Sequence, residues 1–282
     1  MNRSIEEIFN RGERIRQLLS MLSNVFTPKT VYLDDIDKEP CSRSKSIMTH
    51  DRMNFREISC DTGVISGASG SSFISFGDTK VFCAVYGPRA NQRGSVSGPF
   101  SDSGLLECDV RIAASNSHIS TSSSETRMSQ QLRDAITPSV RLTCYPKAVI
   151  SIYVVVVQSG GSELSAVILS ASLAFADASI EINDFVCAAT VGISEHLGDG
   201  GKKKSVFTLD PCREEYDELV SVLTLSSMVN YGATLTHLSV EGHLSTSEFA
   251  PLLEIAKSGC TYLRSILTDC MKRRQLRLEN MQ

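Results

Sequence analysis

The strongest constraint on the fold lies near the middle of the chain, where an unbroken Val/Ile run leads through glycines into a segment of small residues. Residues 148–158 read AVISIYVVVVQ, which is typical of a strand covered on both faces. After Gly160-Gly161-Ser162, residues 163–177 carry Leu, Ile, Ala and Phe on one helical face and Ala, Ser and Val on the rest. This predicts a helix buried nearly all round. Because neither element offers a polar face to solvent, other elements must cover both.

The surrounding pattern predicts those other elements. Alternating apolar and small residues indicate a β-meander within 58–86, with Gly77-Asp78 as a turn and Gly87-Pro88 ending its last strand. Further strands are predicted at 105–113, 185–193, 206–209, 220–225 and 235–240. Strands and helices in this arrangement predict an α+β fold, with mixed sheets and packed helices.

Two more helices are indicated around this core. One helical face is formed by Leu132, Ile136 and Val140. Pro138 limits how regular that helix can be. A last helix is predicted over 247–274, with Ser247 as its N-cap. The Ser/Thr-rich stretch 115–124 has too little apolar content to pack, so we predict a mobile insertion there.

The N-terminal region differs from the rest. Residues 1–26 place apolar side chains at spacings of three, four and seven, which predicts an amphipathic helix. Residues 34–46 are polar and predict a flexible linker. We therefore divide the chain into a helix and linker at 1–48 and a folded domain at 49–275. The pattern fits equally a helix packed on its own domain and a helix docked on a neighbouring protein.

Composition narrows the class of protein. With a net charge of −4, any nucleic-acid contact must come from a local patch or from partner proteins. The nine cysteines form no CxxC pair and no zinc-ligand spacing, and no nucleotide-binding motif occurs, so we expect free thiols without metal or cofactor. The apolar runs are shorter than the about 18 to 20 residues that a membrane span needs. No signal-peptide core opens the chain, so we expect no membrane association.

Four segments, taken in chain order, resemble the RNase PH family of phosphorolytic ribonucleases. They are VYGPR at 85–89, DAITPSVRL at 134–142 with YPK at 145–147, Gly160-Gly161-Ser162 with AFADA at 174–178, and Asp210 with Glu214-Glu215. Each segment alone is weak, but four in register over 49–275 are specific. The resemblance implies an RNase PH-like fold, built from two β-α-β halves similar to domain 2 of ribosomal protein S5.

Within that family, the segments 134–142 and 145–147 are most similar to the subgroup of eukaryotic RNA exosome ring subunits called mRNA transport regulators. This implies a hetero-hexameric ring with other RNase PH-like subunits, capped by S1/KH-domain proteins. Such a ring threads RNA toward an associated exosome nuclease. The resemblance also implies a location in the nucleus, including the nucleolus, and in the cytoplasm.

Active members of the family hold phosphate at a helix N-terminus, where backbone N–H groups, a hydroxyl and an arginine offset its charge. The matching positions here are Gly160, Gly161, Ser162 and Glu163. The glycines and the hydroxyl are retained, but Glu163 stands in place of the arginine and would repel a phosphate dianion. Glu163 also fits an ordinary first-turn acid that stabilises its helix. Both interpretations disfavour phosphate.

The second catalytic device of the family is an acid that serves as general acid or metal ligand near the scissile phosphate. Its position falls at Val220 or Ser221, and neither can do this chemistry; a shifted alignment would use Asp217 or Glu218 instead. No catalytic residue and no metal ligand is therefore assigned, and the chain is predicted to be non-catalytic. The alternatives are an active phosphate-dependent 3′ to 5′ exoribonuclease that forms its own ring, and an RNase PH-like scaffold with an unrelated binding role.

Contact with RNA is separate from catalysis. Arg89 matches a family arginine near the RNA path, while Arg93 and Arg111 lie in or beside the neighbouring loop and strand. Lone arginines are more often solvated or paired with carboxylates than bound to RNA. Arg89, Arg93 and Arg111 are the candidate RNA-binding residues.

Overall fold

A computed structural model describes residues 53–90, 102–113, 121–197 and 203–280 of the chain. The N-terminal helix and linker predicted at 1–48 lie outside the described residues, as does Arg93. In the described ranges, no helix is long and apolar enough to cross a bilayer.

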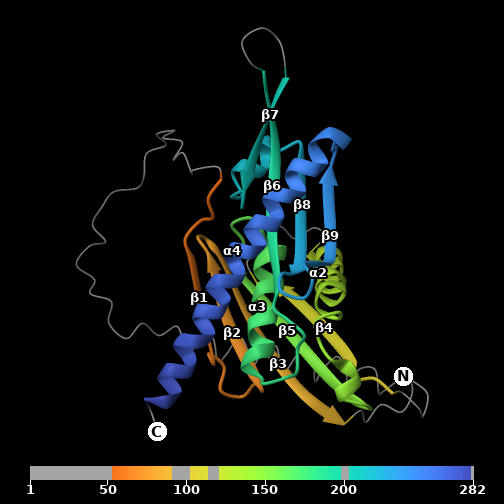
Figure 1. The fold of residues 1–282 in the computed structure, drawn as a ribbon, viewed down its shortest axis with the longest axis vertical. Coiled ribbons are helices and arrows are strands. Elements are labelled where there is room, and N and C mark those ends of the chain that lie inside the picture. Colours follow the sequence, from red (N-terminus) through yellow and green to blue (C-terminus); the bar gives the residue numbers. More distant parts are fainter. Residues whose placement is uncertain (1–52, 91–101, 114–120, 198–202, 281–282) are drawn as a thin grey trace. The chain divides into compact units, whose positions relative to one another are not determined.

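The first sheet holds five strands in the order β1-β2-β3-β5-β4 (Figure 1). The strands are β1 (Ile58–Thr62), β2 (Gly70–Phe76), β3 (Thr79–Ala90), β4 (Leu105–Ile112) and β5 (Ala148–Gln158). All neighbours pair antiparallel except β4 and β5, which are parallel. The predicted strand at 148–158 is confirmed as β5, which is buried over most of its length.

The second sheet holds four antiparallel strands in the order β7-β6-β8-β9. They are β6 (Val186–Leu197), β7 (Lys203–Leu209), β8 (Ser221–Met228) and β9 (Thr234–Gly242). The strand β9 lies at one edge of this sheet, so one side of its backbone has no neighbouring strand within it.

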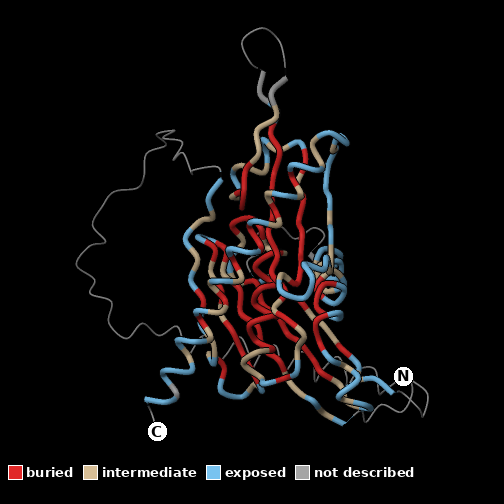
Figure 2. Tube along the Cα trace, in the orientation of Figure 1, coloured by how far each residue is buried: buried red, intermediate tan, exposed pale blue. Residues whose placement is uncertain are grey.

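Three α-helices complete the described fold: α2 (Thr121–Ile136), α3 (Glu163–Asp177) and α4 (Thr246–Glu279). The helix α3 packs on β2 and β3 of the first sheet and on β6 of the second, so it joins the two sheets. All of its residues from Ser165 to Phe175 are buried, as Figure 2 shows in red. This confirms the buried helix and the α+β class predicted from the sequence.

One strand end was predicted wrongly. The strand β3 does not end at Gly87-Pro88 but continues to Ala90, with an irregularity of its pairing to β5 between Tyr86 and Arg89. Proline has no backbone N–H to give to a sheet, so within a strand it is tolerated where pairing is interrupted. The irregularity therefore lets the strand pass the proline.

The mobile insertion predicted at 115–124 is wrong for its last residues, because α2 begins at Thr121. The hydroxyls of this polar helix bond back to its own carbonyls, as Thr126 Oγ1 does to Ser122 O at 2.8 Å and Ser129 Oγ to Glu125 O at 2.7 Å. The helix ends at Ile136, before Pro138 and Val140, because proline disfavours helical geometry at the residue before it.

The last helix begins and ends beyond its predicted limits. Ser245, rather than the predicted Ser247, occupies the N-terminal capping position of this helix. The Ser245 hydroxyl lies 2.7 Å from Glu248 Oε2, and the Ser245 N–H donates to the same oxygen at 3.4 Å. This pairing of a serine with a glutamate three residues later satisfies orphan groups at a helix start. At the other end, α4 continues past 274 to Glu279.

Leucine-to-alanine substitutions at two helical sites test the packing. Leu173 on α3 is fully buried, whereas Leu276 on α4 is 58% exposed. We expect Leu173→Ala to lower the free energy of unfolding by about 2 to 5 kcal/mol, because it removes buried methyl groups and leaves a cavity. Leu276→Ala should change it by less than about 0.5 kcal/mol. Urea titration followed by circular dichroism measures both, and equal losses would contradict the layered core.

Candidate functional site

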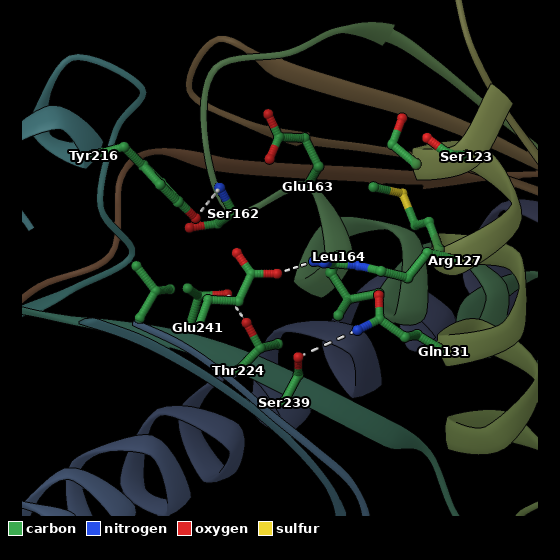
Figure 3. A pocket seen from close by; sticks show the side chains of 14 residues that line it. Ser123, Arg127, Gln131, Ser162, Glu163, Leu164, Tyr216, Thr224, Ser239 and Glu241 are labelled. Atoms are coloured by element: carbon green, nitrogen blue, oxygen red, sulfur yellow. Dashed lines mark hydrogen bonds and ion pairs between the residues drawn. The ribbon is translucent and has the colours of Figure 1, made fainter. Parts of the chain in front are cut away.

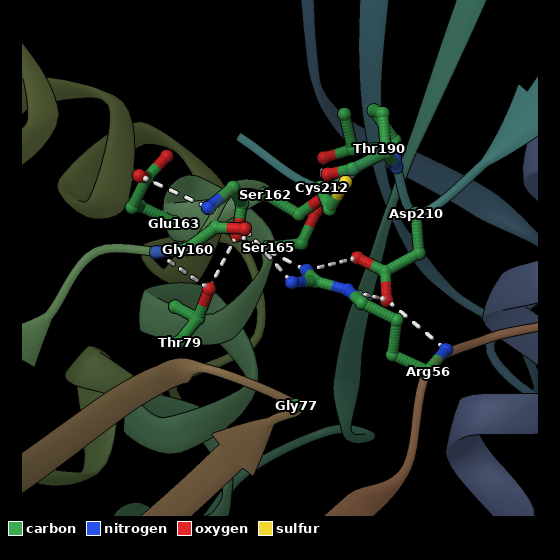
Figure 4. A network of polar contacts seen from close by, with 12 residues as sticks. Arg56, Gly77, Thr79, Gly160, Ser162, Glu163, Ser165, Thr190, Asp210 and Cys212 are labelled. Atoms are coloured by element: carbon green, nitrogen blue, oxygen red, sulfur yellow. Dashed lines mark hydrogen bonds and ion pairs between the residues drawn. The ribbon is translucent and has the colours of Figure 1, made fainter. Parts of the chain in front are cut away.

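A buried ion pair holds the turn between β5 and α3 (Figure 4). The Arg56 guanidinium donates from Nε and Nη2 to the Asp210 carboxylate at 2.9 and 2.8 Å. The same guanidinium donates to Gly160 O at 2.8 Å and to Gly161 O at 3.2 Å. The Arg56 and Asp210 side chains are only 9% and 2% exposed. The pair therefore ties the start of the domain, the turn and the end of β7 together.

Further contacts fix the turn from other sides. Thr79 Oγ1 donates to Gly161 O at 2.6 Å and accepts the Gly160 N–H at 3.2 Å, while Arg213 N donates to Gly160 O at 3.0 Å. Burial by itself would lower the pKa of Arg56, but the hydrogen bond and charge of Asp210 outweigh it and raise that pKa. The arginine therefore stays charged at every physiological pH.

The turn requires glycine at its second position. Gly161 has a φ of 104°, and a Cβ there would lie 2.5 Å from Pro211 O. Both the backbone conformation and the space therefore exclude larger residues. The sequence-predicted Gly160, Gly161, Ser162 and Glu163 thus form one rigid turn that opens α3.

The hydrogen-bond donors of this turn are occupied by groups of the chain itself. The Gly161 N–H donates to Glu163 Oε1 at 3.4 Å, and the Ser162 N–H donates to Tyr216 Oη at 3.2 Å. The Ser162 hydroxyl donates to Pro211 O at 3.4 Å, and Ser162 is 2% exposed. The Glu163 carboxylate also accepts a hydrogen bond from the Ser159 hydroxyl. The Glu163 carboxylate and the Tyr216 hydroxyl thus already accept hydrogen bonds from N–H groups that an anion near a helix N-terminus would use.

The tyrosine stays protonated in this setting. Burial raises the pKa of Tyr216 to about 12, and the negative charge of Glu163 adds to the shift. Its neutral hydroxyl oxygen can accept the Ser162 N–H without placing a second charge beside Glu163.

A cavity of about 420 Å³ lies beside the turn (Figure 3). Its charged lining residues are Glu163 on α3, Glu241 on β9 and Arg127 on α2. The Arg127 and Glu241 side chains form an ion pair, so two carboxylates share one cation around this space. Its other polar lining residues are Ser123, Ser124, Gln131, Ser162, Thr190, Tyr216, Thr224 and Ser239. The net negative charge of the side chains that line the cavity therefore disfavours binding of an anion.

The two positions predicted to match the catalytic acid face different surroundings. Val222 and Thr224 line the cavity, and side chains alternate along a strand, so Ser221 falls on the other face of β8, while Val220 precedes the strand. Ser221 is 3% exposed and Val220 is 39% exposed. Neither carries an acid. Asp217 and Glu218, the shifted candidates, are exposed and do not line the cavity.

The predicted RNA-binding arginines lie apart from the turn and from each other. Arg89 pairs with Val149 near the start of β5, whereas Gly160 follows the end of that strand, about 30 Å further along. Arg111 stands level with Val155 on the same strand. The structure therefore separates Arg89 from the predicted phosphate residues along β5.

The two arginines also differ in their electrostatic surroundings. Arg111 forms ion pairs with Asp109 at 3.2 Å and with Glu125 at 3.0 Å, which offset its charge. The guanidinium of Arg89 lies over the Tyr86 ring, 5.4 Å from the ring centroid. Its Nη2 is buried and has no hydrogen-bond partner among the described residues. Arg89 therefore keeps a donor that Arg111 has already used.

Sequence reasoning missed most of the residues that shape this site. Arg56 contacts Asp210 across 154 positions, and nothing in the local pattern around Arg56 indicates that contact. Tyr216, Arg127 and Glu241 were likewise not predicted. Asp210 was noted within the fourth resembling segment, and it is the only one of these five residues with a signal in the sequence.

Comparison with known proteins finds one family and related exosome components. The family model "3′ exoribonuclease family, domain 1" (RNase PH) matches residues 54–181. The human "Exosome complex component MTR3" is 31% identical, over 87% of this chain and 90% of its own length. The "Exosome complex component Rrp41" of Pyrobaculum aerophilum is 33% identical, over 81% of this chain and 89% of its own.

A solved structure agrees on the fold. The crystal structure of rice (Oryza sativa) Rrp46 superposes with a TM-score of 0.63 at 23% identity, covering 78% of this chain and 95% of that one. At this identity the likeness concerns the fold alone, and it confirms the RNase PH-like fold predicted from the sequence.

A double-mutant cycle tests the ion pair that holds the turn. We expect Arg56→Met to lower the free energy of unfolding by about 3 to 5 kcal/mol, because it leaves the Asp210 carboxylate buried and unpaired. Adding Asp210→Asn removes that charge, so the double variant should lose less than the sum of the single variants. Urea unfolding of all four proteins measures the coupling. Strictly additive losses would contradict the pairing.

Proposed function

The chain belongs to the RNase PH family of 3′ exoribonucleases, and from this membership we propose that it is a non-catalytic subunit of an exosome core ring. In that role it supports 3′ to 5′ RNA processing and decay by helping to form the channel through which RNA passes. The enzyme that degrades the RNA is then a separate nuclease of the same assembly.

One observation carries the non-catalytic assignment: the N–H groups of Gly161 and Ser162, in the turn before α3, are used internally. The Glu163 carboxylate accepts from Gly161 N–H, and Tyr216 accepts from Ser162 N–H. A phosphate would have to displace both acceptors and then lie beside the Glu163 charge. Like charges in a partly buried site repel strongly, so phosphate gains nothing from entering.

The position predicted for the catalytic acid also lacks a carboxylate. On the cavity side of β8 the chain presents Val222 and Thr224, preceded by Val220, and the nearest acids on that stretch are exposed. The carboxylate of Glu241 does reach the cavity, but it is paired with Arg127. These features argue against the alternative of an active phosphate-dependent exoribonuclease that forms its own ring.

The partners follow from the relatives, which are named as components of exosome complexes. We assign the chain to the mRNA transport regulator (MTR3) subgroup and place it in a hetero-hexameric ring with other RNase PH-like subunits. S1/KH-domain proteins cap that ring, RNA enters it, and the location is nuclear, including nucleolar, and cytoplasmic. The ring domain is 49–275, with 1–48 as an additional N-terminal region.

Arg89 is the residue we assign to RNA among the three candidates. Arg89 is partly exposed, and its guanidinium lies over the Tyr86 ring. Arg111 is neutralised by Asp109 and Glu125, which makes it the weaker candidate. Arg93 lies outside the described residues and stays a prediction.

The described domain also offers an apolar surface for a neighbouring RNase PH-like subunit. One face of β9 meets α2, through contacts such as Gln131 Nε2 to Ser239 Oγ at 3.2 Å. The other face carries exposed aliphatic side chains: Leu235, Leu238 and Val240, at 44%, 40% and 42%. An unpaired edge strand with such side chains is a surface that proteins normally cover.

The composition of the native assembly tests the proposal. The tagged chain is purified from its own cells, and its mass and partners are determined. A large assembly with several different RNase PH-like chains and S1/KH-domain proteins supports the ring subunit, and the neighbours identify the subgroup. A homo-hexamer or homodimer would overturn it.

Restoring the missing charge tests the altered phosphate site. We expect Glu163→Arg to bind inorganic phosphate about ten- to a hundredfold more tightly than the natural chain, because a charged donor replaces a repelling acceptor. Isothermal titration calorimetry measures the affinity, with Glu163→Gln as the neutral control. If the arginine variant binds no better than the glutamine variant, Gly160 to Glu163 is not the altered phosphate site.

A matched pair of leucine-to-aspartate variants tests the β9 surface. We expect Leu238→Asp to reduce recovery of the other RNase PH-like chains at least about tenfold, since a carboxylate would be buried at an apolar contact. Leu276→Asp, at a more exposed leucine on α4, should leave recovery unchanged. Quantitative mass spectrometry of the purified assemblies measures both. Equal recovery would exclude β9 as the contact.

A further inference from the structure

Two cysteines from distant parts of the chain meet where α4 crosses the first strand of the first sheet. Cys60 lies on β1 and Cys270 on α4, separated by 210 positions. The Cys270 thiol donates to the backbone carbonyl of Cys60 at 3.3 Å, so the Cys270 sulfur lies directly against the residue that carries the other thiol. Both are free thiols, 6% and 4% exposed.

A cation stands beside the Cys60 sulfur. Arg273, one turn from Cys270 on α4, places Nη2 3.9 Å from Cys60 Sγ. The hydrogen bond from Cys270 and the charge of Arg273 lower the pKa of Cys60 against the effect of burial. The same hydrogen bond raises the pKa of Cys270. The pair therefore contains one sulfur suited to ionise and one suited to keep its proton.

A second cysteine pair in the chain provides a contrast. Cys260 of α4 donates to the carbonyl of Cys187 on β6 at 3.4 Å, in an arrangement similar to that of Cys270 and Cys60. Burial raises the pKa of Cys187 well above its usual value and that of Cys260 to about 11. Thiols of this kind are inert, because the thiolate is the reactive form. Proximity to another cysteine alone does not make a reactive pair.

The position of Cys60 also favours access. The strand β1 is the edge strand of its sheet and pairs only with β2. Edge elements open locally at a lower free energy than central ones. Local opening of β1 would therefore expose the Cys60 sulfur to a small oxidant, whereas Cys187 lies on β6, between β7 and β8.

We propose that Cys60 and Cys270 form a reversible disulfide when the protein meets a peroxide, and that this bond fastens α4 to β1. The proposal is independent of the function proposed above, since it concerns the thiols and not RNA or phosphate.

The chemistry balances with hydrogen peroxide as the oxidant. The Cys60 thiolate attacks one peroxide oxygen; the O–O bond breaks, an S–O bond forms, and hydroxide leaves, taking up the proton that Cys60 gave to solvent on ionising. Cys270 sulfur then attacks Cys60 sulfur. The S–S bond forms, the S–O bond breaks, and the hydroxyl departs with the Cys270 proton as water. Two thiols lose two electrons, and one peroxide becomes two waters.

The bond would reinforce contacts that already join the end of α4 to the rest of the domain. Arg274 forms an ion pair with Asp177 at the end of α3, and Arg277 approaches Asp61 on β1 at 3.5 Å. The second pair is exposed and contributes little by itself. A disulfide closing a loop of this length restricts the unfolded chain strongly. Oxidation should thus hold the C-terminal turns of α4 against the sheet.

The test uses the full chain treated with hydrogen peroxide, followed by alkylation and peptide mapping by mass spectrometry. We expect one peptide pair joined through Cys60 and Cys270, and a rise in the thermal midpoint of about 5 to 10 °C that dithiothreitol reverses. Cys60→Ala and Cys270→Ala should each lack both effects. Cys187→Ala, the matched control at the other pair, should retain both.

A second variant separates reactivity from folding. Arg273→Gln removes the cation without touching either sulfur, and it should slow formation of the bond several-fold while leaving the final product the same. The proposal is overturned if Cys60 is oxidised only to sulfinic acid, if Cys187 and Cys260 are joined instead, or if both Cys60 and Cys270 remain reduced.

Discussion

The ion pair between Arg56 and Asp210 is the contact on which the rest of the site depends. One guanidinium neutralises a buried carboxylate and also donates to the carbonyls of Gly160 and Gly161. It thereby joins the start of the described domain to the turn that opens α3 and to the end of β7. Because a buried charge is tolerated only when it is paired and hydrogen-bonded, these four residues hold one another in place.

The turn before α3 presents N–H groups that could bind an anion, but side chains of the same protein already accept hydrogen bonds from them. Glu163 and Tyr216 accept the N–H groups of Gly161 and Ser162, and the Ser162 hydroxyl is turned to Pro211. The turn therefore retains its framework while its donors serve internal contacts.

The sequence was sufficient where a local pattern decides the outcome. The limits of β5 and α3 were predicted correctly from the apolar run 148–158 and the small-residue segment 163–177. Elements that are buried on all sides consist almost entirely of apolar and small residues, and this composition distinguishes them from surface elements. The prediction failed at Thr121, where α2 begins within a Ser/Thr-rich stretch whose hydroxyls bond to helix carbonyls. The predicted strand end at Pro88 was also wrong, because β3 continues past this proline at an irregularity in its pairing with β5.

The sequence by itself determined the α+β class, the family resemblance and the presence of a glutamate at position 163, since each follows from residue type at a given position. Only the tertiary structure decided what those residues meet. It paired Arg56 with Asp210, gave Arg111 two carboxylates while leaving a donor of Arg89 without a described partner, and set Cys60 beside Cys270. Most of these contacts join residues far apart along the chain, and charge, pKa and access depend on such neighbours rather than on local order.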